Sequence, residues 1–168
     1  MLKEIIIVLV LYVTTTKSFG QSDSIKASSI DKYSYQLDTS NIKFDSLNLV
    51  IDSIEIEVMK SGDKIITKNH FTKSNTTLTI TYFLKAKKIV LINIVEPSKK
   101  MKKMYRFSYL YYENDFIIHE THRRTWPSGL AISIEDLSSN IFGYNESFTI
   151  EFLKFYVMKL YKKICNYS

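Results

Sequence analysis

Two neighbouring runs of residues constrain the fold of this chain more than any other feature. Thr76–Leu84 alternates threonine with leucine, isoleucine and tyrosine, which is the two-residue period of a β-strand. Ile89–Val95 is apolar on both faces, as expected of a strand inside a sheet. Residues 85–88 (KAKK) form a short charged connection between them. The two runs therefore predict an antiparallel hairpin.

The register of this hairpin predicts one core face. With a two-residue turn, Leu84 lies opposite Ile89, and Tyr82 lies opposite Leu91. The residues expected to share the core face are Leu78, Ile80, Tyr82, Leu84, Ile89, Leu91 and Val95.

Residues 105–123 predict a second hairpin. A two-residue turn would put Arg106 directly opposite Arg123, and like charges facing each other are unfavourable. A three-residue turn avoids this and pairs Leu110 with Ile118. We expect the second register.

Residues 45–60 fit two periods at once. The apolar residues at helical spacing are Leu47, Val50, Ile51, Ile54 and Val58. The alternation of Ile54, Ile56 and Val58 with glutamates instead fits a strand. We favour the helix slightly and keep the strand as the alternative.

The C-terminal segment predicts an amphipathic helix that ends at Ile164 and is capped by Asn145 or Ser147. Its apolar stripe comprises Ile150, Leu153, Tyr156, Val157, Leu160, Tyr161 and Ile164. The expected fold is thus α+β: a curved antiparallel β-meander of four to six strands, with helices, including this C-terminal helix, packed on one face.

The first 44 residues predict an export signal and an arm. Lys3 precedes a nine-residue apolar run, Ile5–Val13, and small residues near Gly20 suit a cleavage site. Such a run is too short to cross a bilayer as a helix, which takes about 20 residues. We interpret residues 1–20 as a signal peptide, 21–44 as a polar, partly ordered N-terminal arm, and 45–168 as a single α+β domain. The chain is expected in the periplasm or outside the cell, with no transmembrane segment after cleavage.

Net charge, cysteine content and motifs limit the partners and the chemistry that we expect of this chain. The net charge of +6 favours acidic surfaces, but export argues against nucleic acid as the partner. Cys165 is the only cysteine, so the chain has no intramolecular disulfide. His119 and His122 lie three apart on an expected strand and should point to opposite faces, so we expect no metal site. No G-x-S-x-G motif or phosphate-binding glycine loop is present, and we expect no catalytic residues or cofactor.

An aromatic strand is the candidate binding surface. Tyr105, Phe107 and Tyr109 alternate along one face of their strand, and Arg123 and Trp126 could rim that face. If this face looks outward, it could contact a sugar ring or a protein partner.

Residues 76–120 resemble small exported bacterial proteins of unknown function that carry repeated β-hairpins. The matching segments are Tyr82-Phe83 with Lys87-Lys88-Ile89, and Tyr111-Tyr112 with Asn114-Asp115-Phe116. The resemblance implies a β-meander and no particular activity. We expect an exported binding or interaction protein, inhibitor-like or partner-binding. The alternative is a small-molecule or glycan-binding module with a pocket between sheet and helix, and a hydrolase is the weakest of the three.

Overall fold

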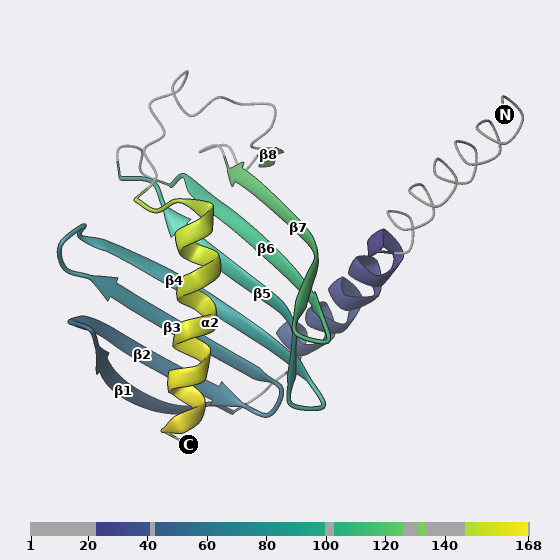
Figure 1. Ribbon diagram of the computed structural model, residues 1–168, viewed down its shortest axis with the longest axis horizontal. Coiled ribbons are helices and arrows are strands. Elements are labelled where there is room, and N and C mark those ends of the chain that lie inside the picture. The colour runs from purple at the N-terminus through teal and green to yellow at the C-terminus, as the bar shows by residue number, and fades with distance from the viewer. Residues whose placement is uncertain (1–22, 41–42, 100–102, 126–130, 134–146, 168) are drawn as a thin grey trace, which may run out of the picture.

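One antiparallel sheet forms the centre of the structure (Figure 1). The computed structural model describes residues 23–40, 43–99, 103–125, 131–133 and 147–167. The strands neighbour one another in chain order: β1 (Asp45–Ile51), β2 (Ile54–Ser61), β3 (Lys64–Phe71), β4 (Thr76–Lys85), β5 (Lys88–Pro97), β6 (Tyr105–Glu113), β7 (Phe116–Thr125) and β8 (Ala131–Ser133). The expected α+β meander is confirmed, but its described part has eight strands, the last of only three residues, where four to six were expected.

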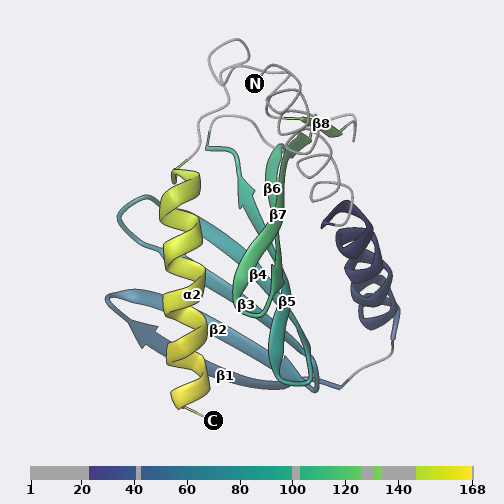
Figure 2. The same ribbon diagram turned by 45° about the vertical axis from the view of Figure 1, so that its right-hand side comes forward.

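Two helices lie on opposite faces of this sheet, so the expectation of helices on one face is wrong (Figure 2). Helix α2 (Ile150–Asn166) packs on the face that we call the inner face. An N-terminal helix, residues 23–39, packs on the outer face through Ala27, Ile30 and Leu37. The arm expected there is therefore helical, because packing on the sheet overrides the low helix propensity of its serines and aspartates.

Residues 45–60 form strands β1 and β2, so the favoured helix is wrong and the alternative is confirmed. The two-residue turn between them, Asp52 and Ser53, has φ values of 51° and 64°. This is the backbone of a type I′ hairpin turn, whose twist suits antiparallel strands. Ile54, Ile56 and Val58 turn inward together, and burying them outweighs the helical spacing of the same segment.

Two bulges correct the expected registers. Leu84 does lie opposite Ile89, but the register shifts next to Phe83, so Tyr82 faces Ile92, and Leu91 belongs to the outer face. The hairpin of β6 and β7 has a two-residue turn at Asn114 and Asp115, again with positive φ.

A shift between Tyr111 and Tyr112 then places Leu110 opposite Glu120, so the expected pairing of Leu110 with Ile118 is wrong. It also places Arg106 opposite Arg124. Arg123, the partner that a two-residue turn was expected to give Arg106, lies opposite Phe107 instead. Two arginines still face each other, and Glu96, directly opposite Arg106 on β5, supplies a compensating charge.

The inner face carries the larger core. The residues of α2 buried there are Leu153, Tyr156, Val157, Leu160 and Ile164, all members of the predicted apolar stripe. The helix cap is Thr149, whose hydroxyl accepts a hydrogen bond from the Phe152 amide at 3.1 Å. Of the two predicted caps, Asn145 lies outside the described residues.

Ser147, the other predicted cap, instead bonds to the sheet. Its amide donates to the Glu96 carboxylate at 2.6 Å, and its hydroxyl lies 2.8 Å from that of Thr76. Arg106 donates to the same carboxylate and, at 2.8 Å, to the Phe148 carbonyl. Glu96 and Arg106 are both buried, so this ion pair ties the segment before α2 to β5 and β6.

Candidate functional site

An aromatic hollow opens between the sheet and the first half of α2. It has a volume of about 480 Å³, within the range of small-molecule sites. The turns after β1 and β3 form one side and α2 forms the other. We call it the aromatic pocket; its lining residues are Asp52, Ser53, Ile54, Phe71, Thr72, Lys73, Ser74, Phe148, Phe152, Phe155, Tyr156 and Lys159.

The floor of the aromatic pocket is a row of rings along α2. Phe152 and Tyr156 lie four residues apart on one side of α2, and Phe148, which precedes the Thr149 cap, continues the row through its contact with Phe152. Successive ring centroids lie 5.0 and 5.6 Å apart, with interplanar angles of only 15° and 10°. The rings are therefore stacked on one another, which covers part of each ring face. Phe71 from β3 packs beside the row, 4.6 Å from Phe148 and 5.2 Å from Tyr156.

Buried polar contacts hold this floor in place. The Tyr156 hydroxyl donates to the side-chain carbonyl of Asn69 at 3.1 Å, and the Asn69 amide donates to the Thr67 hydroxyl at 2.8 Å. Burial raises the pKa of Tyr156 well above its ordinary value, so the phenol stays neutral. A satisfied network of this kind fixes the side-chain positions before any ligand arrives.

The rim of the aromatic pocket combines charge with exposed apolar surface. Lys159 on α2 pairs with Asp52 in the turn after β1 at 2.7 Å. The hydrogen bond from Lys159 lowers the pKa of the Asp52 carboxyl. Beside this pair, Phe155 is 69% exposed and Phe152 is 38% exposed. Large aromatic side chains left in water next to a preformed hollow are typical of an interaction site.

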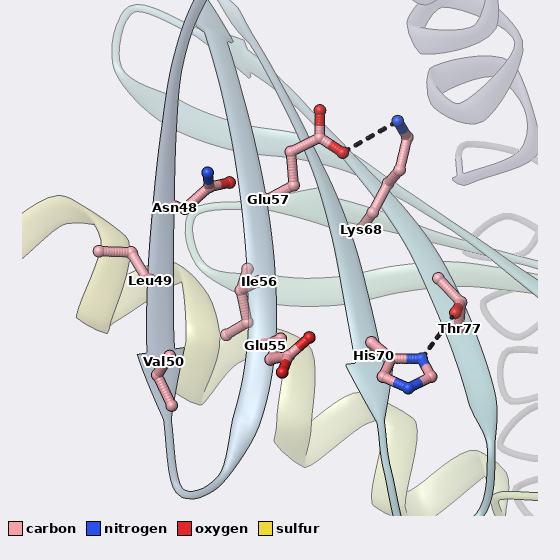
Figure 3. Close-up of a pocket in the computed structure, with 9 residues that line it drawn as sticks. All are labelled: Asn48, Leu49, Val50, Glu55, Ile56, Glu57, Lys68, His70 and Thr77. Atoms are coloured by element: carbon pink, nitrogen blue, oxygen red, sulfur yellow. Dashed lines mark hydrogen bonds and ion pairs between the residues drawn. The ribbon is translucent and has the colours of Figure 1, made fainter.

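A second hollow lies on the outer face over β1–β4, with α2 behind the strands (Figure 3). Its volume is about 520 Å³, and it is lined by Asn48, Leu49, Val50, Glu55, Ile56, Glu57, Lys68, His70 and Thr77. Lys68 pairs with Glu57 at 3.0 Å, and the His70 ring lies 3.2 Å from the Thr77 hydroxyl. Lys68 and Glu57, two of the charged groups of this hollow, thus already bind each other.

The structure brings four of the five predicted site residues together on the outer face. Phe107 lies 6.3 Å from Tyr105 and 6.5 Å from Tyr109, between ring centroids, and Arg123 is its direct partner on β7. Tyr105 is 40% exposed, whereas Tyr109 packs against the cluster beneath the N-terminal helix, and burial raises its pKa. The fifth predicted residue, Trp126, lies outside the described part of the chain, as does the predicted signal peptide.

These four residues lie across the sheet from the aromatic pocket, which sequence reasoning missed. One indication was available in the sequence. The phenylalanines at positions 148, 152 and 155 lie outside the predicted apolar stripe of the C-terminal helix, so they add aromatic surface that the stripe does not bury. No local pattern indicates that Phe71, far away in the chain, completes the cluster.

His119 and His122 point to opposite faces of the sheet, as predicted. His119 contacts the ring of Tyr111 on the outer face, whereas His122 lies 2.9 Å from the Ser108 hydroxyl on the inner face. Among the residues that the structure describes, no three His, Cys, Asp or Glu side chains are placed to share a metal ion.

Comparison with protein-family models, with curated proteins and with solved structures found no match to this chain. Within the described residues, neither helix has the length and apolar character needed to span a bilayer.

Proposed function

We propose that this chain is an exported binding protein that holds a small apolar molecule in the aromatic pocket. The observation that carries the proposal is a fixed aromatic floor, in which Phe152 is still 38% exposed, beside the exposed ring of Phe155 at its edge. Burying a phenylalanine side chain is worth about 1.5–3 kcal/mol, so two exposed rings are a costly surface unless a ligand covers them.

The ring geometry favours an apolar ligand over a sugar. A sugar stacks on a free aromatic face and needs several hydrogen-bonding groups around it. Here the faces of Phe148, Phe152 and Tyr156 are partly covered by one another, and two of the three charged lining groups, Asp52 and Lys159, bind each other. A hydrocarbon or aromatic body needs only the apolar floor and is the better match.

Binding of an uncharged fluorescent probe, N-phenyl-1-naphthylamine, tests the proposal. We expect saturable binding of one probe per chain, weakened about tenfold or more by Phe152→Ala or Phe155→Ser. Phe116→Ser is the matched control, because Phe116 is 76% exposed but lies at the turn between β6 and β7. Equal weakening by the control, or no saturable binding, would refute the pocket.

A protein partner on the outer face is the second candidate function. It is favoured by the row of Tyr105, Phe107 and Tyr109, which runs from solvent toward the N-terminal helix beside Arg123. Here we expect one host protein at fixed stoichiometry with the purified chain, lost in Tyr105→Ala and retained in Phe155→Ser. Retention in both variants would remove this candidate.

A further inference from the structure

Strand β1 forms an edge of the sheet, and among the described elements only β2 pairs with it (Figure 1). Edge strands expose backbone N–H and C=O groups and are normally protected by lysine, proline or a bulge. The β1 sequence, DSLNLVI, contains neither lysine nor proline, and its register with β2 is unbroken from end to end. Val50, near its end, is 72% exposed. Within the part of the chain that the structure describes, this edge is therefore long, regular and without these protections.

The turn after β1 determines which backbone groups point outward. In a two-residue type I′ hairpin, the pair flanking the turn exchanges both of its hydrogen bonds, and that pair is Ile51 and Ile54. Bonding alternates along the strand, so the odd-numbered residues bond to β2. Ser46, Asn48 and Val50 consequently direct their N–H and C=O groups away from the sheet.

We propose that β1 pairs antiparallel with β1 of a second copy of this chain, with Asn48 opposite Asn48. In this register all seven residues of the strand are paired, and Ser46 lies opposite Val50. Every outward-directed backbone group then meets an outward-directed group. A shift of one residue would lose this match and turn apolar side chains to the wrong face.

The side chains agree with the same register. On the inner face Leu47 lies opposite Leu49 of the second copy, and both are only partly buried in the single chain. Asp45, the one charged residue of β1, lies opposite Ile51, so no like charges meet. The symmetry is twofold and closed, which gives a dimer and not a fibre. Both α2 helices lie on one face of a continuous sheet.

Disulfide trapping tests the register residue by residue. In a Cys165→Ser background, Asn48→Cys places two cysteines across the twofold axis, with Cα atoms about 5.5 Å apart, which a disulfide can bridge. Ser46→Cys is the matched control on the same exposed edge. Its two copies are offset by four residues, about 14 Å, beyond the reach of a disulfide. We expect mild oxidation to give a covalent dimer of Asn48→Cys only; equal trapping of both variants would overturn the proposal.

The mass in solution is the companion measurement. Sedimentation equilibrium of the purified protein should give twice the mass of one chain, and Asn48→Thr, which keeps the backbone donor, should leave it unchanged. Asn48→Pro removes one outward N–H without touching the bonds to β2 and should give monomers. Monomers of the unsubstituted protein, together with no trapping of Asn48→Cys, would overturn the proposal and leave this edge to a strand of a different protein.

Discussion

The two faces of the sheet are covered in different ways. The inner face and α2 share a continuous apolar core that reaches from β2 to β6. On the outer face, the buried apolar cluster beneath the N-terminal helix has four members: Ala27, Phe83, Leu91 and Tyr111. Apolar area buried from water is the main source of stability. We therefore expect α2 to contribute more to the stability of the whole protein than the N-terminal helix does.

On the outer face, polar contacts add to the stability that the smaller apolar cluster provides. Lys64 pairs with Asp38 at 2.5 Å, and the Tyr111 hydroxyl donates to Asp31 at 2.8 Å. Lys26 also pairs with Glu113 at 2.6 Å, and both of these side chains are substantially exposed. An exposed ion pair such as that of Lys26 with Glu113 contributes little in water and weakens with salt. The comparison therefore predicts that the N-terminal helix opens locally while α2 unfolds only with the whole sheet.

The largest effect is expected at the buried ion pair of the inner face. Arg106→Leu leaves the Glu96 carboxylate buried without this guanidinium and should cost about 3–5 kcal/mol. Unfolding in urea measures the loss. The double variant Glu96→Leu with Arg106→Leu removes both charges and should recover much of it. A double variant that is less stable than Arg106→Leu alone would contradict this account of the ion pair.

Shortening one apolar side chain on each face compares the helices directly. Leu160→Ala on α2 should lower the free energy of unfolding of the whole protein by about 2–5 kcal/mol. Leu37→Ala should act mainly on the N-terminal helix, by about 1 kcal/mol or less, because Leu37 is only partly buried. Hydrogen exchange separates global from local opening. Equal global destabilisation by both changes would contradict the comparison.

Salt should change amide exchange differently in the two helices, and this effect should be smaller than those of the substitutions. Raising the ionic strength from 0.1 to 1 M shortens the screening length from about 10 Å to about 3 Å. Amides of residues 23–39 should then exchange about two- to threefold faster, whereas those of α2 should change little. A uniform response across both helices would show that charge does not hold the N-terminal helix.

The smallest effect concerns Tyr112 on the inner face. Its hydroxyl is buried and has no hydrogen-bond partner among the described residues, so Tyr112→Phe should be neutral or slightly stabilising at pH 7. Burial raises the pKa of Tyr112 from 10.0 to about 12. The folded state thus favours the neutral phenol, and the resulting stability is present below pH 10 and lost as the pH rises to about 12. Urea titrations at pH 9 and 11 should show a smaller alkaline loss for Tyr112→Phe.

Local sequence patterns predicted those helices and strands whose buried side chains recur at a regular spacing. The stripe of α2, the antiparallel strands after residue 64 and the opposite orientations of His119 and His122 all follow from periodicity. The ambiguity at 45–60 was genuine, since the same residues satisfy two periods and only pairing with β3 decides between them.

Non-local contacts explain what sequence reasoning missed. The two bulges depend on how whole strands fit together, and the facing pair of Arg106 and Arg124 is accompanied by Glu96 on the next strand. The N-terminal helix depends on a sheet formed later in the chain. The aromatic pocket likewise needs Phe71 and Phe152 to meet, and no spacing rule connects them.

Hydrogen exchange with and without N-phenyl-1-naphthylamine tests the central claim most directly, because it locates a bound apolar molecule on one face. We predict protection in the turn after β3, where the amides of Ser74 and Asn75 bond to Phe71 and Thr72, and in the first turns of α2. The N-terminal helix and β7 should be unchanged. Protection confined to the N-terminal helix and the row of Tyr105, Phe107 and Tyr109, with none at the aromatic pocket, would contradict the account.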